Sequence, residues 1–280
     1  MRIFLTGATG FIGSNVLAHA LKAGHEVVAL RRKASSAAVV SLPHEPRWIE
    51  GTLADLSVCD LQDCAVVVHL ASAGVSPKQV PWPELVEANV VGSAHVVATA
   101  HAAGIRRIVV AGTCHEYGIS AMDYDAIPAD AALEPLNLYG ASKAAAYQLV
   151  SAFARVHGLE LFYGRIFSAY GEGQYEGNFW PSLRKAALNG QDFPMSSGSQ
   201  IRDFIPVEAV GAELLRACQR MDLRPGEPCT ENIGTGYPMT LLAFAQQEWL
   251  RFDASGQILP GARADRPDDV ERFVPLLPSH

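Results

Sequence analysis

A glycine-rich turn near the N-terminus constrains the fold of this chain more than any other feature. Residues 2–5 have the composition of a short β-strand, glycines follow at positions 7, 10 and 13, and residues 11–23 have a helical pattern. Such glycines make the turn tight, let a pyrophosphate approach the backbone and let the helix pack closely on the strand. The turn predicts a dinucleotide site; an ordinary turn between strand and helix is the alternative. The predicted cofactor-binding residues here are Gly7, Thr9, Gly10, Phe11, Ile12 and Gly13.

A tyrosine and a lysine stand four residues apart in an alanine-rich segment, residues 139–157, that has a helical pattern. Tyr139 and Lys143 therefore share one face of the predicted helix. An ammonium group near a phenol lowers the tyrosine pKa, which makes the phenol a proton donor or acceptor near neutral pH. The pair predicts an acid/base site, and a solvated helix face is the alternative.

Strand-like and helix-like segments alternate through the first 166 residues. This alternation predicts an α/β fold, a Rossmann-type doubly wound parallel sheet covered by helices. Thr113 follows one predicted strand, and the carboxyl ends of parallel strands form the ligand crevice, so we expect its hydroxyl to bind a substrate carbonyl beside Tyr139. The predicted strands, after the first, are residues 27–30, 65–71, 107–112 and 159–166, and the predicted helices are residues 11–23, 85–103 and 139–157.

Glycine and proline become frequent after about residue 167, and the alternation weakens. We expect a dinucleotide-binding domain over residues 1–167, with a return segment at about 205–236. Residues 168–204 and 237–280 are then expected to form a smaller C-terminal substrate-binding domain.

Composition excludes several classes of partner. The net charge of −7, without a basic tract, argues against nucleic acid and against an anionic membrane surface. The five cysteines are odd in number and form no C-x-x-C motif, so neither a disulfide framework nor a metal site is expected. The chain begins on a strand without a signal-like segment, and its apolar runs are too short to span a bilayer, so we expect a cytoplasmic protein.

Taken together, these motifs resemble the extended short-chain dehydrogenases/reductases, in the group of sugar-nucleotide epimerases, dehydratases and reductases. The resemblance covers most of the chain. It rests on residues 6–13, 68–71, 89–93, 112–118, 139–143, 164–171 and 201–205.

The resemblance implies roles for individual residues. Thr113, Tyr139 and Lys143 correspond to the catalytic triad of the family, and Lys143 also to the contact with the nicotinamide ribose. Leu70 and Ala71 are implied to line the cofactor site. The residues implied to bind substrate are Ser72, Asn178, Arg202 and Arg266, of which Arg202 corresponds to the arginine that pairs with the diphosphate and Arg266 is a second candidate for that contact.

The second strand ends without the acidic residue that holds the ribose hydroxyls in NAD-binding members. Arg31 and Arg32 stand there instead. Two arginines favour a ribose phosphate, so we expect NADP(H), with NAD(H) as the alternative.

The sequence constrains the reaction less than it constrains the fold. Dehydratases of this group carry an Asp-Glu pair directly after the catalytic threonine, whereas this chain has Cys114 and His115. The preferred interpretation is NADPH-dependent reduction of a keto-sugar nucleotide, a nucleoside-diphosphate 4-keto-6-deoxyhexose, in deoxysugar biosynthesis. Alternatives are an epimerase with His115 as an acid/base residue, a reductase of non-nucleotide ketones or aldehydes, and a regulatory protein that senses NADP(H) without turnover. Family resemblance also suggests a homodimer through the helices at 85–103 and 139–157.

Overall fold

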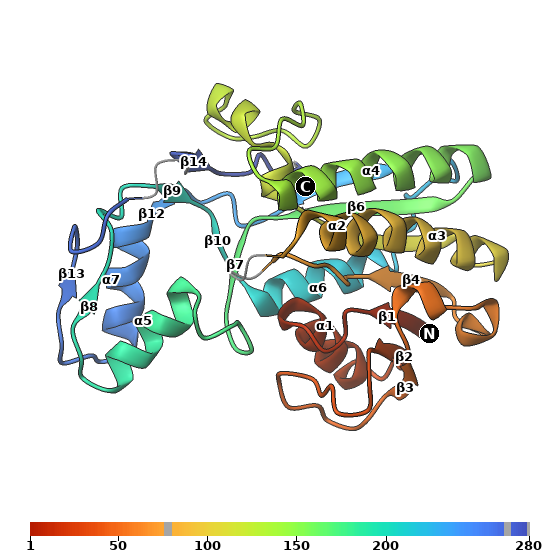
Figure 1. Ribbon diagram of the computed structural model, residues 1–280, viewed down its shortest axis with the longest axis horizontal. Helices are drawn as coiled ribbons and strands as arrows, with labels where there is room; N and C mark the ends of the chain where they lie inside the picture. The colour runs from red at the N-terminus through yellow and green to blue at the C-terminus, as the bar shows by residue number, and fades with distance from the viewer. Residues whose placement is uncertain (76–79, 266–269, 279–280) are drawn as a thin grey trace.

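The computed structural model describes residues 1–75, 80–265 and 270–278. Its centre is a seven-stranded parallel sheet with the strand order β11-β6-β5-β4-β1-β2-β3, which confirms the predicted doubly wound fold (Figure 1). The strands of this sheet are β1 (Arg2–Thr6), β2 (Glu26–Arg31), β3 (Arg47–Glu50), β4 (Val66–His69), β5 (Arg107–Thr113), β6 (Glu160–Ile166) and β11 (Cys229–Ile233).

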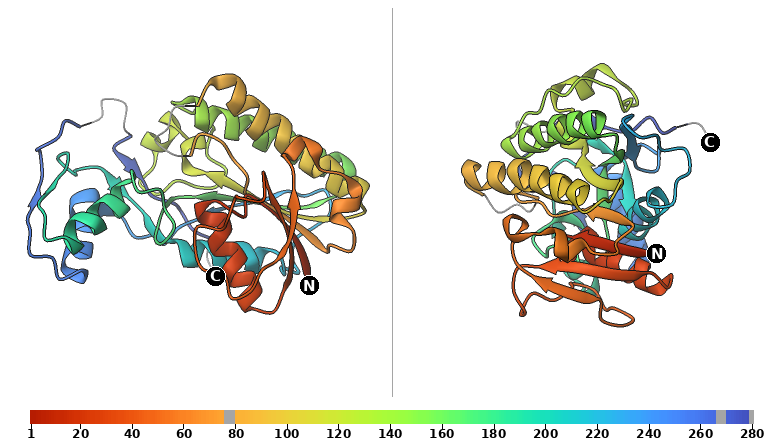
Figure 2. Two further views of the ribbon diagram at one scale, coloured as in Figure 1. Left: turned by 60° about the horizontal axis from the view of Figure 1, so that its bottom comes forward. Right: turned by 90° about the vertical axis from the view of Figure 1, so that its right-hand side faces the viewer.

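Helices cover both faces of the sheet, because successive side chains of each strand point to opposite sides. Ile3 and Leu5 of β1 pack with α1 (Phe11–Lys22) and α6 (Val207–Ala217). Phe4 of the same strand packs on the other face, with α3 (Gly92–Ala102) and α4 (Leu138–His157). Figure 2 shows α3 and α4, in gold and green, side by side.

Two elements differ from the sequence-based expectation. The edge strand β3 was not predicted, because its four residues alternate too briefly to give a pattern. The single helix expected over 85–103 is instead α2 (Trp82–Leu85), a π-helical turn η3 (Val86–Val91) and α3. Asn89 lies in the π turn and is fully buried, and its side-chain amide bonds both the N–H and the carbonyl of Ala73. Hydrophobic periodicity cannot reveal a π-helical turn of this kind.

A smaller lobe lies beyond the carboxyl ends of the strands (Figures 1 and 2). Its core joins Leu183, Phe193, Met195, Ala245 and Trp249. Its elements are α5 (Phe179–Leu188), β8 (Phe193–Pro194), β9 (Ile201–Arg202), β12 (Met239–Thr240), α7 (Leu241–Arg251), β13 (Ile258–Leu259) and β14 (Arg272–Phe273).

Short elements connect the two parts. The parallel pair β7 (Ser168–Tyr170) and β10 (Phe204–Pro206) leads the chain into the smaller lobe and back. The remaining turns are η1 (Leu53–Asp55), η2 (Val58–Leu61), η4 (Cys114–Glu116) and η5 (Ile119–Asp123). Among the helices that the structure describes, none has the length and apolarity that crossing a membrane requires.

Candidate active site

The glycine turn between β1 and α1 fits a dinucleotide. Gly7 has a φ of +73°, and a Cβ at this position would lie 2.6 Å from the amide nitrogen of Ala71. A Cβ at Gly13 would lie 2.0 Å from the carbonyl oxygen of Gly7, so helix and turn pack without room for a side chain. Helix α1 starts at Gly10 without a side-chain cap or an acidic residue in its first turn, which favours an anion at this helix end.

The neighbouring wall is fixed by a buried histidine. The expected strand at 65–71 ends at His69, and the amides of Leu70 and Ala71 turn to the Thr6 hydroxyl at 3.3 and 3.2 Å. His69 Nδ1 lies 2.7 Å from the same hydroxyl. Burial, with a smaller contribution from the charge of Lys143, lowers the pKa of His69 to about 3, so the ring is neutral. Leu70 and Ala71 therefore stand at the carboxyl ends of β1 and β4, close to Gly7.

Thr113, Tyr139 and Lys143 come together at the carboxyl end of β5. Thr113 is the last residue of β5 and caps the η4 turn. Tyr139 and Lys143 lie on α4, and the Tyr139 hydroxyl lies close to the side chains of Thr113 and Ser72. The Lys143 ammonium donates a 2.7 Å hydrogen bond to the carbonyl oxygen of Ala111.

The pKa of Tyr139 differs from the sequence-based expectation. The spacing to Lys143 predicts a lowered value, whereas the structure raises it. Burial of the phenol is the largest cause and the charge of Glu116 adds to it, although the Tyr139 side chain as a whole keeps part of its surface exposed. Burial also lowers the pKa of Lys143, and Glu116 partly opposes this.

Ser72 joins the phenol to the buried Asn89. Its hydroxyl donates a 3.0 Å hydrogen bond to Asn89 Oδ1, and Asn89 Nδ2 donates at 2.9 Å to the hydroxyl of Ser142 on α4. The structure thus places Ser72 next to Tyr139.

His115 and Arg202 reach the same place through an aromatic residue that the sequence did not single out. The ring of His115 lies 6.2 Å from the Tyr139 ring and 5.8 Å from the Phe273 ring, edge-on to both. The Arg202 guanidinium lies over Phe273, 5.4 Å from the ring centre, and its Nη1 donates to the carbonyls of Ile201 and Glu271. Phe273 comes from β14, which pairs with β9, so only the fold brings it here.

The predicted ribose-phosphate site has an unexpected acidic partner. Arg31 ends β2, and its Nη2 donates a 2.9 Å hydrogen bond to Glu50 at the end of β3, while its guanidinium lies over the Trp48 ring at 5.1 Å. The charge of Arg31 is therefore already balanced. Arg32 is exposed next to it.

Two predicted substrate residues are not joined to this group. Asn178 lies at the N-terminal end of α5 in the smaller lobe. Arg266 lies outside the described residues. Across residues 1–75, 80–265 and 270–278, no three His, Cys, Asp or Glu side chains are gathered as a metal site would require.

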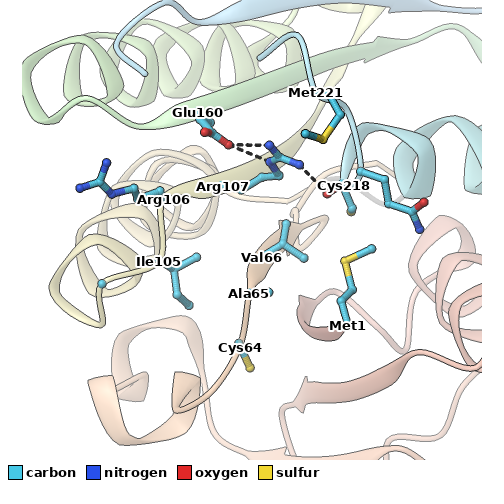
Figure 3. Close-up of a pocket in the computed structure, with 12 residues that line it drawn as sticks. Met1, Cys64, Ala65, Val66, Ile105, Arg106, Arg107, Glu160, Cys218 and Met221 are labelled. Atoms are coloured by element: carbon cyan, nitrogen blue, oxygen red, sulfur yellow. Dashed lines mark hydrogen bonds and ion pairs between the residues drawn. The ribbon is translucent and has the colours of Figure 1, made fainter. Parts of the chain in front are cut away.

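A hollow of about 540 Å³ lies at the opposite end of the sheet (Figure 3). It is lined by Val66, Arg107 and Glu160, which begin β4, β5 and β6, whereas Thr113 and His69 end β5 and β4. Arg107 donates there to Glu160 and to the carbonyl of Cys218. Ligands of open parallel sheets bind at the carboxyl ends of the strands, so we do not assign the active site to this hollow.

Known proteins are similar to this chain over most of its length. The sequence profile described as "NAD dependent epimerase/dehydratase family" matches residues 3–234. The dTDP-glucose 4,6-dehydratase of Streptomyces antibioticus is 29% identical over 255 residues, which cover 86% of this chain and 74% of that protein. The UDP-glucose 4-epimerase of Corynebacterium glutamicum is 28% identical over 227 residues, which cover 74% of this chain and 68% of that protein.

Solved structures agree with the sequence relatives. The structure of MoeE5 in complex with UDP-glucuronic acid and NAD is 30% identical, with a TM-score of 0.84, and the match covers 99% of this chain and 90% of that one. The family profile and this structure cover the glycine turn, the η4 turn and helix α4 together. The chain therefore belongs to the NAD dependent epimerase/dehydratase family and is an enzyme of the extended short-chain dehydrogenase/reductase class.

Proposed function

We propose that this enzyme reduces a keto-sugar nucleotide, a nucleoside-diphosphate 4-keto-6-deoxyhexose, in deoxysugar biosynthesis. The observation that carries the proposal is the gathering of Thr113, Tyr139 and Lys143 at the carboxyl end of β5. A nicotinamide dinucleotide bound at the glycine turn supplies the hydride.

Tyr139 donates the proton that a ketone needs when it becomes an alcohol. Its raised pKa keeps the phenol protonated near neutral pH, which is the form that a reduction consumes. Thr113 donates a hydrogen bond to the same carbonyl oxygen and polarises it. Lys143, held by the Ala111 carbonyl oxygen, presents its ammonium group to the nicotinamide ribose, and its positive charge stabilises the tyrosinate that the proton transfer leaves.

We propose NADP(H) as the preferred cofactor, because Arg31 and Arg32 end β2 where an acid would hold ribose hydroxyls. Glu50 weakens this preference, since it already pairs with Arg31. NAD(H) is the alternative, and the related structure of MoeE5 in complex with UDP-glucuronic acid and NAD supports it.

Arg202 grips the diphosphate of the substrate in this proposal. The Phe273 ring under its guanidinium and the Ile201 carbonyl hold the arginine close to the η4 turn. Asn178 and Arg266 are proposed as further substrate contacts. The lobe made from residues 168–204 and 237–280 is then the substrate-binding domain, and residues 1–167 with 205–236 bind the cofactor.

An epimerase is the second candidate function. The edge-on contact between His115 and Tyr139 favours it, because an imidazole can act as an acid/base residue beside the phenol. A dehydratase is disfavoured, since Cys114 and His115 replace the Asp-Glu pair. Burial raises the pKa of the Cys114 thiol to about 12, so this group stays neutral.

A homodimer through α3 and α4 is also proposed. Leu149 and Val156 are seven residues apart on α4, so they share a face, and they are 50% and 78% exposed. Light scattering of the purified enzyme tests this, and a monomeric mass at micromolar concentration would contradict it.

The function is tested by turnover with a panel of nucleoside-diphosphate keto-sugars and either reduced cofactor. The proposal predicts stoichiometric loss of reduced cofactor and a product with one more hydroxyl group. Interconversion of two sugar nucleotides without net consumption of cofactor would favour the epimerase instead. Consumption of reduced cofactor with simple ketones but not with sugar nucleotides would favour the non-nucleotide reductase.

A further inference from the structure

A buried ion pair lies directly behind the proposed catalytic group. Glu116 ends the η4 turn and is 0% exposed, and Arg165 on β6 is 1% exposed. Arg165 Nε donates a 2.7 Å hydrogen bond to Glu116 Oε2. Burying two charges is costly, and a buried pair is often no more stabilising than apolar side chains of the same size. The two charges therefore point to a role other than stability.

The arginine is fixed by aromatic rings and backbone. Its guanidinium carbon lies 4.5 to 5.7 Å from the ring centres of Tyr147, Tyr117 and Tyr163. Its Nη1 donates a 2.7 Å hydrogen bond to the carbonyl oxygen of Ala129. Arg165 consequently has one position, and it holds the Glu116 carboxylate in one position too.

The other carboxylate oxygen faces the catalytic side. Glu116 Oε1 accepts hydrogen bonds of 2.8 Å from the backbone amide of Thr113 and of 2.8 Å from the Tyr163 hydroxyl. The Tyr163 oxygen also lies 3.3 Å from the carbonyl oxygen of Lys143. One carboxylate thus links the end of β5, strand β6 and, through Tyr163, helix α4.

Two glycines let these parts approach. A Cβ at Gly112 would lie 2.2 Å from the Tyr163 ring and 2.7 Å from Glu116 Oε1. A Cβ at Gly140, in the first turn of α4, would lie 2.4 Å from the carbonyl oxygen of His115. A shift of the η4 turn is therefore passed directly to the helix that carries Tyr139 and Lys143.

We propose that Glu116 is a positioning residue, whose buried carboxylate sets the placement of Thr113 against Tyr139 and supplies negative charge to the acid/base pair. Burial is the largest cause of both pKa shifts; the charge of Glu116 adds to the raised pKa of Tyr139 and partly opposes the lowered pKa of Lys143, in agreement with this role. Tyr139 is kept as the protonated acid and Lys143 as the ammonium. The kinetic test rests on the proposed function, because it needs a turnover assay.

The test compares Glu116→Gln, which keeps the shape but removes the charge, with Glu116→Asp, which keeps the charge. Tyr117→Phe is the matched control. The Tyr117 hydroxyl accepts a hydrogen bond from Arg165 Nη1 and donates one to Asn232 Oδ1, and removing this hydroxyl changes no charge. If Glu116→Gln does not fold because Arg165 is left unpaired, Glu116→Gln/Arg165→Gln replaces it. The titratable groups around the phenol are Glu116, Cys114 and His115 from η4, Lys143 one turn along α4 and Tyr163 from β6.

For Glu116→Gln we expect kcat to fall by about 10- to 100-fold, with KM and the cofactor Kd changed by less than about threefold. The basic limb of the kcat/KM profile should move to lower pH, because the phenol loses its proton more easily without the neighbouring charge. Glu116→Asp should restore the position of this limb, and Tyr117→Phe should leave it unchanged. The charge-free double variant should show the same shift of the limb.

Wild-type kcat in Glu116→Gln, or in the double variant, would overturn the proposal. Equal losses in Glu116→Gln and Tyr117→Phe with an unmoved basic limb would also overturn it, since that result describes a structural role only. Absence of turnover in the wild type refutes the proposed function instead, so the two failures are distinguishable.

Discussion

The Lys143 ammonium donates a 2.7 Å hydrogen bond to the carbonyl oxygen of Ala111, two residues before Thr113. This bond joins helix α4 to the end of β5, so the lysine and the threonine occupy positions that depend on each other. The Lys143 side chain is almost fully buried, and its flexible stem therefore has little freedom. The relative placement of the three proposed catalytic residues is set by the sheet and by α4.

The buried His69 predicts a dependence of stability on pH. Its pKa is lowered from 6.5 to about 3 in the folded chain, so the unfolded chain takes up the proton first as pH falls. The contribution of His69 is fully present above about pH 6.5 and is lost as pH falls from there toward about 3. The slope reaches about 1.4 kcal/mol per pH unit.

Urea unfolding of the wild type and of His69→Gln between neutral pH and pH about 4 measures this dependence. The difference between the two free energies of unfolding should shrink by a few kcal/mol across the range. A difference that is constant with pH contradicts a neutral buried His69.

The glycine turn predicts different effects of the same substitution at two positions. Gly13→Ala puts a Cβ 2.0 Å from the Gly7 carbonyl oxygen, whereas Gly10→Ala puts it 3.3 Å from that atom. We expect Gly13→Ala to lower the free energy of unfolding of the cofactor-free enzyme by about 1–3 kcal/mol. Gly10→Ala should change it by less than about 0.5 kcal/mol. Chemical denaturation measures both free energies of unfolding. Equal effects of the two substitutions would contradict the close packing of Gly13 on Gly7.

Cofactor preference should respond to the charges at the end of β2. Arg31→Ala/Arg32→Ala removes both proposed phosphate contacts and should weaken NADPH binding by about 10- to 100-fold, with NADH changed much less. Glu50→Gln releases Arg31 from its partner and should tighten NADPH binding. Calorimetry with both cofactors is the measurement. If the wild type binds NADH more tightly than NADPH, NAD(H) is the preferred cofactor.

Arg202→Ala should raise KM for a nucleotide sugar by about 10- to 100-fold, because a charge-assisted contact to a diphosphate contributes roughly 1.5–3 kcal/mol. KM for a small uncharged ketone should change little, since that substrate has no diphosphate. Arg202→Lys is the control that keeps the charge but not the bidentate geometry. If KM rises equally for both substrates, the arginine serves only to hold Phe273 and the η4 turn.

Residues with local signals were predictable from the sequence. The glycine spacing, the apolar alternation of the strands and the four-residue separation of Tyr139 and Lys143 are properties of short segments, and they gave the fold and the cluster around Thr113. Phe273 had no such signal, because the pairing of β14 with β9 brings it from the end of the chain.

The pKa of Tyr139 shows why its spacing to Lys143 was not enough to predict the direction of the pKa shift. Helix periodicity places Lys143 on the same face but gives no information about burial, which is the larger effect here. Glu116 and Arg165 were equally hidden, since a buried ion pair reads as two ordinary charged residues in a sequence. The Arg31–Glu50 pair depends on β3, which was too short to predict.

Tyr139 is proposed to donate the proton in the reduction of a keto-sugar nucleotide. The most direct measurement is single-turnover reduction by wild type and Tyr139→Phe with saturating reduced cofactor, together with the cofactor Kd of each. The account predicts a rate lower by about 10²- to 10⁴-fold in the variant and a Kd within about twofold of the wild type. Turnover at the wild-type rate in Tyr139→Phe, with the cofactor bound normally, would contradict it.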